Sequence, residues 1–426
     1  MESIDRQVAT LMQGSEFGDP QIKEQMTKEL RQRLNDARKE GRPLRVYCGY
    51  DVTAPDLHLG HTITMHKLRQ FQNYGHDVTF LIGTFTTLIG DPSDRDEARV
   101  MALEEIVKKN AETYAEQAFK ILDKKKTSIR YNYEWLSKLT FKDVISMASC
   151  FTVQQFMARD RIRARLEKND PLWLRELLYP LAQGYDAVHL KTDVQLGATE
   201  QLFNLMAGRR LQESFGQKPL VAITFPVLVG TDGTDRMSKS RGNYIGIAEP
   251  PETIYGKTMS IPDSIMVQYY ELLTDITPEE LADIQQQMKS GINPMALKKR
   301  LAKTLVTQFY GGKEAEEAEA HFEKTVQNKE LPDEIEEKSF SFNKYTTNLL
   351  NSNKPDEKVV NLSALLADIH MASSRSEATR LIKQGGVSIN GVTIEFAFPP
   401  YPLKSGSIIK VGKRRYVKVI NKDNQV

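Results

Sequence analysis

Cysteine is nearly absent from this chain of 426 residues, which carries Cys48 and Cys150 alone. The two stand far apart and match neither a disulfide framework nor the spacing of a thiolate zinc site. His58, His61 and His66 could form a metal cluster, but no carboxylate or thiolate stands at ligand spacing beside them. We therefore predict that the protein holds no metal of its own.

The chain also lacks any run of about 18 apolar residues, the length that a membrane-spanning helix needs. Its first residues, Met1–Asp5, have neither the basic stretch nor the apolar core of a secretory leader, and they include acids that a transit peptide avoids. With 40% hydrophobic and 27% charged residues, the composition is that of an ordinary globular protein. We expect a cytoplasmic protein without a membrane partner, folded as roughly two to four domains.

Charge is unevenly distributed along the chain. The whole chain has a net charge of +2, yet residues 357–426 hold eleven lysines and arginines against five acids, which is +6. A basic tail on a mildly acidic body indicates a polyanionic partner held by the C-terminal part. A solvated basic face is the alternative, and charge by itself leaves it open.

The first half of the chain has an α/β pattern. Apolar runs predict strands at 44–50, 78–83, 129–133, 193–196 and 221–224. Helical spacing predicts helices at 62–74, 97–122, 153–166, 172–190 and 200–213. This alternation favours a Rossmann-like parallel sheet covered on both faces, with ligands beyond the carboxyl ends of the strands.

The second half changes character twice. Residues 250–310 are helical in pattern, and the acid-rich residues 311–338 predict a helix followed by a linker. Near the end, short helices at 362–368 and 376–384 precede the turn signal Asn390-Gly391, which predicts a hairpin between 387–389 and 392–394. With further strands at 408–411 and 416–420, this segment is a small module of helices and sheet.

A short motif, His58-Leu59-Gly60-His61, follows the first strand and opens a helix. The unbonded backbone N–H groups and the dipole at a helix N-terminus favour an anion, and Gly60 lets a ligand approach the backbone. Histidines three apart share one side of the first turn, so the pair suits a phosphate chain. Two structural histidines are the alternative.

A second motif, Arg236-Met237-Ser238-Lys239-Ser240, lies in a loop between Gly233 and Gly242. Arg236 and Lys239 supply mobile cations and the serines supply hydroxyl donors, as nucleotidyl transfer needs where the leaving group becomes negative. Alone, the motif could be a solvated turn. Both motifs in this order, separated by an α/β domain, are much stronger evidence for this function than either motif alone.

With these two signatures the chain resembles the class I aminoacyl-tRNA synthetases, and most closely the bacterial-type tyrosyl-tRNA synthetases, over nearly its whole length. Further segments that are similar to the family are Tyr47–Ala54, Gly90-Asp91-Pro92-Ser93, Tyr179–Asp186, Ser374–Ala378, Gln384–Val387 and Val411–Arg415. The last three resemble a small RNA-binding domain that is shared with a ribosomal protein. The resemblance implies MgATP, L-tyrosine and tRNA(Tyr) as substrates.

The resemblance also assigns roles to single residues. For tyrosine binding it implies Tyr47 and Asp186 at the phenol, Asp91, Tyr179 and Gln183 at the ammonium group, and Gln195 in the pocket wall. For catalysis it implies Thr53, His58, His61, Arg236 and Lys239. For ATP binding it implies Cys48, Gly49, Asp51, Gly60, Gly197, Glu200, Gln201, Met237, Ser238 and Ser240. Arg95 and Arg99 stand where the family keeps cations near the phosphates or the acceptor end.

The resemblance implies a domain order as well. Residues 1–246 would form the catalytic domain, with an inserted dimerisation segment at about 125–175 and the stretch 150–165 as a plausible homodimer interface. An α-helical anticodon-binding domain at 247–330, a linker at 331–356 and an RNA-binding domain at 357–426 would follow. The implied RNA-binding residues are Lys298, Lys299, Arg300, Arg375, Arg380, Lys383, Lys413, Arg414 and Arg415.

Three departures from the family pattern concern nucleotide contacts. Arg236 replaces the usual first lysine of the loop, Ala198 and Glu200 stand where many relatives have glycine and aspartate, and Asp94 replaces a small residue. Two other functions compete with tyrosine ligation. One is the related tryptophanyl-tRNA synthetase, and the other is a non-catalytic RNA-binding or splicing factor. The pair Tyr47 and Asp186 argues against the first, and the intact signature motifs argue against the second.

Overall fold

The computed structural model describes residues 2–92, 104–290, 293–327, 335–345, 357–394, 401–412 and 415–423. The chain forms two compact units, residues 1–319 and residues 320–426. In the part of the chain that the structure describes, no helix is both long enough and apolar enough to cross a membrane.

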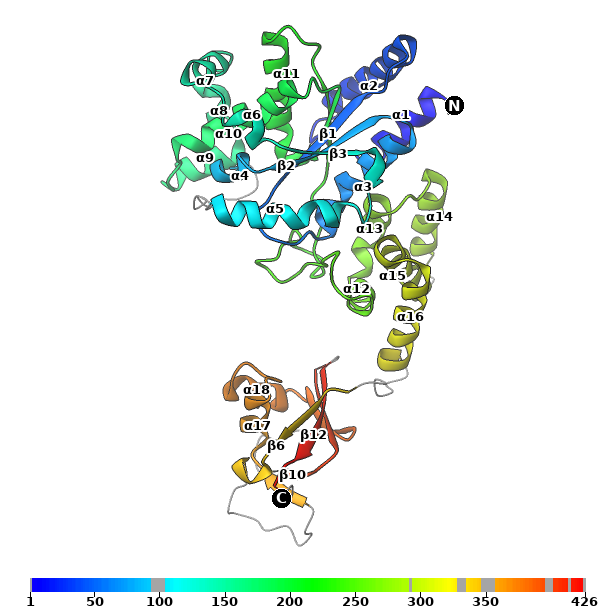
Figure 1. Cartoon of the computed structure of the whole chain (residues 1–426). Helices are drawn as coiled ribbons and strands as arrows, with labels where there is room; N and C mark the ends of the chain where they lie inside the picture. The colour runs from blue at the N-terminus through cyan, green and yellow to red at the C-terminus, as the bar shows by residue number, and fades with distance from the viewer. Residues whose placement is uncertain are drawn as a thin grey trace. The chain divides into compact units, whose positions relative to one another are not determined.

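A five-stranded parallel sheet forms the centre of the first unit (Figure 1). Its order is β3-β2-β1-β4-β5, with all neighbours parallel. The strands are β1 (Arg45–Asp51), β2 (Asp77–Gly83), β3 (Thr127–Tyr131), β4 (Val194–Ala198) and β5 (Val221–Phe225). Consecutive residues of β4 and β5 are buried, so both faces of the sheet are covered. The predicted Rossmann-like parallel sheet is confirmed.

Helices connect and cover these strands. They are α1 (Ile4–Met12), α2 (Pro20–Glu40), α3 (Leu59–Asn73), α4 (Thr86–Ile89), α5 (Glu104–Ala118), α6 (Tyr133–Leu136), α7 (Phe141–Ala148), α8 (Val153–Met157), α9 (Asp160–Glu167), α10 (Leu174–His189) and α11 (Leu202–Ser214). Helices α12 (Pro251–Met259), α13 (Met266–Leu273), α14 (Pro278–Lys289) and α15 (Met295–Tyr310) follow, and α16 (Gly312–Phe322) crosses the boundary between the units.

Several predicted boundaries shift. The helix predicted at 62–74 starts three residues earlier, because His58 caps its first turn. The single helix predicted at 153–166 is wrong: Ala158 and Arg159 separate α8 from α9, and Arg159 has an extended backbone. Of the helix predicted at 97–122, the stretch 97–103 lies outside the described residues.

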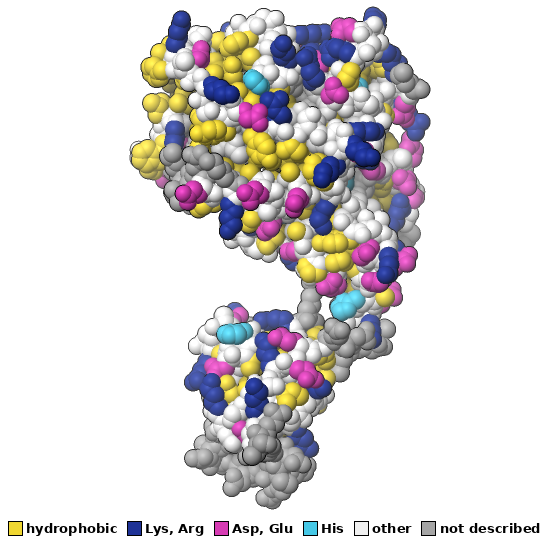
Figure 2. All heavy atoms as spheres, viewed as in Figure 1, with side chains coloured by type: hydrophobic (Ala, Val, Ile, Leu, Met, Phe, Trp, Pro, Cys, Tyr) yellow, Lys and Arg dark blue, Asp and Glu magenta, His cyan; other side chains and the backbone are white. Residues whose placement is uncertain are grey.

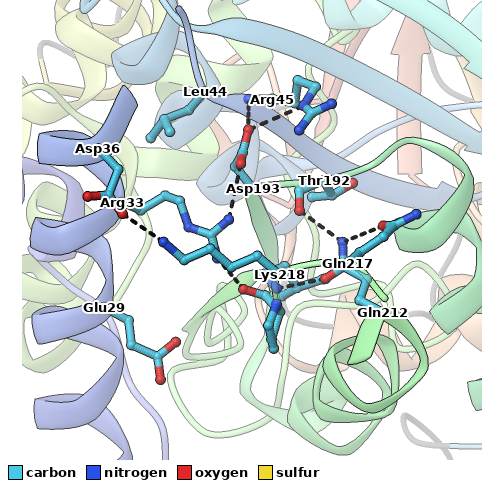
Figure 3. A network of polar contacts seen from close by, with 12 residues as sticks. Glu29, Arg33, Asp36, Leu44, Arg45, Thr192, Asp193, Gln212, Gln217 and Lys218 are labelled. Atoms are coloured by element: carbon cyan, nitrogen blue, oxygen red, sulfur yellow. Dashed lines mark hydrogen bonds and ion pairs between the residues drawn. The ribbon is translucent and has the colours of Figure 1, made fainter. Parts of the chain in front are cut away.

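The sequence pattern assigned no element before Leu44, yet α1 and α2 occupy most of that stretch. One buried carboxylate ties α2 to the sheet (Figure 3). Asp193, just before β4, accepts from Arg33 Nη1 of α2 at 3.1 Å and from the backbone N–H of Arg45 at 2.9 Å. Arg33 also donates to the carbonyl of Pro219, just before β5. Two further guanidinium groups contact the same carboxylate, that of Arg45 with Nε at 3.3 Å and that of Arg42 with Nη1 at 2.8 Å.

The second unit is a small α+β module. Its five-stranded sheet has the order β6-β12-β11-β8-β9, and β10 pairs with β7 beside it. The elements are β6 (Glu337–Phe340), β7 (Glu357–Val360), α17 (Leu362–Asp368), α18 (Arg375–Lys383), β8 (Val387–Ile389), β9 (Val392–Thr393), β10 (Tyr401–Lys404), β11 (Ser407–Val411) and β12 (Arg415–Asn421). The hairpin predicted at Asn390-Gly391 is present between β8 and β9.

The linker predicted at 331–356 is wrong for part of its length. Strand β6 lies inside it and pairs in parallel with β12, from Lys418 opposite Glu337 to Asn421 opposite Phe340. The next turn buries Phe342 completely in the core of the second unit. Polar residues alternate with aromatic ones here, as in an edge strand that is exposed on one face, so this stretch lacks the continuous apolar run that predicts a buried strand.

We expect Asp193→Ala to lower the free energy of unfolding by about 3 kcal/mol, because it leaves buried Arg33 without its carboxylate. The arginines hold the pKa of Asp193 below its usual range. Its stabilising effect is therefore fully present above pH of about 4, the unfolded pKa, and is lost as the pH falls through the folded pKa.

Urea unfolding of the wild-type protein and of Asp193→Ala across this pH range measures the difference in the free energy of unfolding. The matched control is Asp36→Asn, which removes the exposed pair that Asp36 makes with Lys218 and should change little. An equal loss in both variants would contradict the role of Asp193 as a clamp between α2 and the sheet.

Candidate functional site

Two adjoining cavities open at the carboxyl ends of β1 and β4. We call them the inner cavity and the outer cavity; Thr53, Gly60, His61, Gly197 and Gln201 are among the residues that line both. Predicted residues that line the inner cavity alone are Tyr47, Cys48, Gly49, Asp51, Asp91, Tyr179, Gln183 and Asp186. Predicted residues that line the outer cavity alone are His58, Glu200, Arg236, Met237, Ser238, Lys239 and Ser240. The two motifs and the segments between them thus meet at one place.

A buried carboxyl group lies in the inner cavity. Asp186, on α10, accepts from Trp135 Nε1 at 2.8 Å and from Asn132 Nδ2 at 3.1 Å. Burial raises the pKa of Asp186 to about 8, and the two hydrogen bonds limit that rise. Tyr47, from β1, is fully buried, and its hydroxyl lies 3.5 Å from the carbonyl of Gln183. A phenol oxygen of Tyr47 and the Asp186 carboxyl can therefore face one polar group of a ligand.

Asn132 and Trp135 were not predicted from the sequence. Asn132 is completely bonded: its carbonyl oxygen accepts from Phe85 N at 2.8 Å, and its amide donates to Thr86 Oγ1 at 3.0 Å as well as to Asp186. The ring of Trp135 stacks on His189 at 4.3 Å. Asn132 follows β3 directly and Trp135 lies on α6, the next helix. A polar residue at the end of a parallel strand was the signal that could have found Asn132.

The same hydrogen-bond chain continues to a second carboxylate. Thr86 donates to Asp51 Oδ1 at 2.7 Å, and the hydroxyl of Tyr179 donates to Asp51 Oδ2 at 3.1 Å. Gly83 is required here, because a Cβ at that position would lie 2.3 Å from Asp51 Oδ1. The chain from Asp186 to Tyr179 consequently orients the polar groups of the inner cavity before any ligand enters.

Asp91 adds a third carboxylate to the inner cavity. Its oxygens lie 3.4 Å from Gln201 Nε2 and from Asn204 Nδ2, which are long contacts. Asn204 also donates to Gln183 Oε1 at 3.1 Å, so the amide N–H₂ of Gln183 faces away from it. The Asp91 carboxylate suits an ammonium group. Gln195 departs from the prediction: it is buried on β4 and lines neither cavity, and no hydrogen-bond partner for its amide lies among the described residues.

The imidazoles of His58 and His61 bond to the backbone of their own turn. His58 Nδ1 accepts from Gly60 N, and His61 Nδ1 accepts from His58 N, both at 3.1 Å. Burial lowers the pKa of His58 to about 2 and that of His61 to about 4. Both rings are therefore neutral at pH 7, with the proton on Nε2, because Nδ1 is an acceptor in each. Each ring can donate one hydrogen bond from Nε2 to an anion.

These bonds correct the prediction for the helix N-terminus. Leu59 N donates to Ile245 O at 3.0 Å and His61 N to His58 O at 2.9 Å, while Gly60 N is bonded to the His58 ring. The first backbone N–H groups are thus already bonded, and the imidazoles offer donors in their place. A Cβ at position 60 would meet His58 Cε1 at 2.9 Å, so the His58 ring is what requires a glycine here.

Each cation of the second motif contacts a carboxylate across the outer cavity. Lys239 Nζ donates to the carbonyl of Asp56 at 2.7 Å and lies 3.5 Å from its carboxylate. Arg236 lies 3.5 Å from Glu200 Oε2, and the other oxygen of Glu200 binds Arg161 Nη2 at 2.6 Å. Arg161 was not predicted, and its partner Glu200 is one of the family departures. The side chains of Lys239 and Arg236 therefore line the outer cavity and contact carboxylates at 3.5 Å.

The loop itself has an ordered frame. Asn243 Oδ1 accepts from Ser238 N at 2.8 Å, and Asn243 Nδ2 donates to Asp232 at 2.5 Å. Met237 N donates to Leu228 O at 2.7 Å, and the Met237 side chain is buried. Gly230 has no room for a side chain, because a Cβ would lie 2.3 Å from Asn243 Nδ2. These bonds fix the backbone of the loop, whereas Lys239 and Arg236 contact their carboxylates at 3.5 Å.

The predicted RNA-binding residues have different surroundings. Lys298 is mostly buried, since it donates to Ile261 O at 2.8 Å and pairs with Asp263, whereas Arg300 pairs with Glu280 at 3.2 Å on the surface. Of the predicted RNA-binding residues in the second unit, those described are Arg375, Arg380 and Lys383 on α18 and Arg415 on β12, and all four are exposed. Lys413 and Arg414 lie outside the described residues, as do Arg95 and Arg99. Their roles stay predictions.

Among the described residues, no group of three or more histidine, cysteine, aspartate or glutamate side chains stands close enough to hold a metal ion. Cys48 is buried in β1, and burial raises the pKa of its thiol to about 11, so it is a neutral thiol at pH 7.

Two family models match the chain. The model of the class I tRNA synthetases (W and Y) matches residues 39–327, and the S4 domain model matches residues 360–395. The tyrosine–tRNA ligase of Carboxydothermus hydrogenoformans is 45% identical over 422 residues, which is 99% of each chain. The enzyme of the same name from Dehalococcoides mccartyi is 47% identical over 381 residues, covering 89% of this chain and 92% of its own.

Solved structures give the same fold. The tyrosyl-tRNA synthetase of Archaeoglobus fulgidus, solved with L-tyrosine, superposes with a TM-score of 0.59 at 23% identity, over 74% of this chain and all of its own. A truncated mitochondrial tyrosyl-tRNA synthetase of Aspergillus nidulans has a TM-score of 0.59 at 19% identity, over 75% of this chain and 93% of its own.

We expect Trp135→Phe to raise the pKa of Asp186 by about one further unit, because the indole N–H stabilises the charged carboxylate. A pH titration followed by NMR of ¹³C-labelled aspartate measures this pKa. Tyr133→Phe is the matched control: it lies in the same turn of α6 and is exposed. An unchanged midpoint in Trp135→Phe would contradict the assignment of Trp135 as the partner of Asp186.

Proposed function

The chain belongs to the class I tRNA synthetases for tryptophan and tyrosine and is a tyrosine–tRNA ligase, and we propose that its two cavities carry out tyrosine activation by ATP and transfer to tRNA(Tyr). The observation that carries this proposal is the buried Asp186 carboxyl beside Tyr47, in a cavity that adjoins both signature motifs. No other described part of the chain combines these features.

Tyrosine occupies the inner cavity in this proposal. Its phenol meets Tyr47 and Asp186, and its ammonium group meets Asp91, with Tyr179 and Gln183 beside it. A buried carboxyl group bonded by two N–H donors keeps at least one lone pair for a phenol O–H. Phenylalanine would leave these polar groups without a partner, and such a loss is the strongest basis for rejecting it.

The ATP phosphates occupy the outer cavity. His58 and His61 donate from Nε2 to phosphate oxygens, while Thr53 lies at the junction of the two cavities. Mg²⁺ arrives as part of the ATP complex and belongs to the substrate. Lys239 and Arg236 leave Asp56 and Glu200 and turn to the pyrophosphate as its charge grows.

Activation needs no general base. The tyrosine carboxylate is ionised at pH 7 and attacks the α-phosphorus of ATP, so a new C–O–P bond forms while the bond to pyrophosphate breaks. Neutral histidines fit this chemistry, because they donate hydrogen bonds without having to lose a proton. Catalysis then rests on positioning and on stabilising the leaving group. In the second step a ribose hydroxyl at the 3′ end of the tRNA attacks the carbonyl carbon of the tyrosyl-adenylate. A new ester bond forms, the bond from that carbon to the phosphate oxygen breaks, and AMP leaves as the hydroxyl proton passes to the departing phosphate.

In this proposal, the second unit and the helices α12 to α15 bind the tRNA. The S4 match covers α17 and α18, where Arg375, Arg380 and Lys383 are exposed along one helix. Lysine and arginine side chains on one face bind phosphates without reading bases directly. In the helices of the first unit, Arg300 is a better candidate than Lys298, because the Arg300 side chain is 53% exposed whereas the Lys298 side chain is 12% exposed.

A homodimer is the assembly that the exposed surface supports. Large apolar side chains lie open on α7, α8, α10 and the turn before it; they are Phe141 80%, Ile145 55%, Val153 67%, Trp173 55% and Leu174 76% exposed. Figure 2 shows hydrophobic side chains gathered on the side of the first unit where α7 to α10 lie. Exposed apolar area of this kind marks an interface, and it falls inside the predicted segment 125–175.

Pyrophosphate exchange into ATP tests the proposed function. We expect exchange with tyrosine and at most weak exchange with tryptophan or phenylalanine. Exchange with tryptophan alone would instead favour the tryptophanyl enzyme, and none with any amino acid would favour a non-catalytic RNA-binding protein. Lys239→Ala should slow exchange by about 10²- to 10³-fold and leave tyrosine affinity unchanged, because Lys239 serves the leaving group. An equal loss of tyrosine binding would contradict this assignment.

Substituting the apolar surface tests the dimer. We expect Phe141→Asp with Leu174→Asp to convert the protein to a monomer, because a dimer interface would bury these side chains without a partner for the new carboxylates. Light scattering on a sizing column measures the mass. Val392→Asp, at another exposed apolar position in the second unit, is the control and should not change it. A wild-type chain that is monomeric at micromolar concentration would exclude this assembly.

A further inference from the structure

The segment between β1 and α3 is held along its length by one face of α5. Asn110 Nδ2 donates to Val52 O at 3.1 Å, and Tyr114 OH lies 3.4 Å from Asp51 O. Further along the segment, Thr113 Oγ1 donates to Pro55 O at 2.6 Å. These positions recur at the spacing of one helical face, so a single helix holds the segment 52–57 from one side.

Gln117 makes the most complete of these contacts. Its Oε1 accepts from the backbone N–H of Leu57 at 2.7 Å, and its Nε2 donates to the carbonyl of Pro55 at 2.9 Å. One side chain thus bonds two backbone groups that are two residues apart. Gln117 is 7% exposed and Leu57 is completely buried, so water cannot readily replace either bond.

The segment carries groups on which the outer cavity depends. Thr53 lines both cavities, and the carbonyl of Asp56 accepts from Lys239 Nζ. Leu57, the last residue of the segment, precedes the capping residue His58, whose backbone N–H donates to the His61 ring. A shift of Leu57 therefore moves the position from which both imidazoles donate.

We propose that Gln117 is a positioning residue for activation: it holds the segment 52–57 so that Thr53 and the two imidazoles meet the ATP phosphates. This rests on the proposed function. Gln117 touches no substrate; it acts through the backbone of Pro55 and Leu57. The tyrosine groups in the inner cavity have other supports, from Asn132, Trp135 and Thr86. Loss of Gln117 should thus affect ATP and spare tyrosine.

Gln117→Met, which has nearly the same shape and neither polar atom, is the main variant. We expect kcat/KM for ATP in pyrophosphate exchange to fall roughly tenfold to hundredfold, because misplacement by a fraction of an ångström disturbs the reacting geometry. The dissociation constant of tyrosine, measured without ATP, should stay within about twofold of wild type. Gln117→Glu keeps an acceptor for Leu57 N and should recover part of the loss.

Glu116→Gln is the matched control, since it is the neighbouring, exposed position on α5 and should behave as wild type. Hydrogen exchange of the backbone amides in 52–57, without substrates, should be faster in Gln117→Met than in the control. Should Gln117→Met fail to fold, Thr113→Val removes one bond of the same face and is expected to show a smaller loss in the same direction.

The outcomes separate the two proposals. Wild-type chain that exchanges no pyrophosphate with tyrosine overturns the proposed function, and the amide exchange rates then still decide the role of Gln117. Folded Gln117→Met with wild-type kcat/KM for ATP, or with equal losses for tyrosine and ATP, overturns the positioning role alone.

Discussion

The whole site depends on one constraint of the parallel sheet, namely that β1 and β4 are neighbours whose following helices leave in different directions. The order β3-β2-β1-β4-β5 places the reversal between these two strands. No connecting segment can fill the space beyond their carboxyl ends, so a crevice forms there. Tyr47 to Asp51 from β1 and Gly197 and Ala198 from β4 line it. The other functional groups reach this crevice from helices, as Tyr179, Gln183 and Asp186 do from α10, or from loops, as Arg236 and Lys239 do.

Sequence reasoning was strong where the chemistry lies in short segments and weak where it depends on distant partners. His58, His61, Lys239 and Asp186 could be named, because each stands in a recognisable segment. Trp135 could not, because its value lies in a hydrogen bond to a residue 51 positions away. The same holds for Arg33 and Asp193, whose separation of 160 positions leaves no periodic signal.

Local patterns failed for α2 and β6 for physical reasons. Helix α2 is predominantly polar. It buries only a narrow stripe that includes Met26, Leu30 and Leu34, together with the side chain of Arg33, so it lacks a broad apolar face that the sequence would reveal. In the predicted linker, β6 is an edge strand with half of its residues exposed, so it lacks the continuous apolar run of the central strands. Both elements are defined by what they pack against, which a single segment does not reveal.

The two cavities differ in how firmly their polar groups are held, and this difference fits the order of events in activation. In the inner cavity, Asp186 and Asp51 are bonded to buried neutral donors, which fix the positions of these two carboxyl groups. In the outer cavity, Lys239 and Arg236 contact partly exposed carboxylates at 3.5 Å. Partly exposed ion pairs contribute roughly 1 kcal/mol or less, so they cost little to break. In the proposed activation step, ATP recruits both cations at small cost, and their charge becomes most favourable when the pyrophosphate leaves.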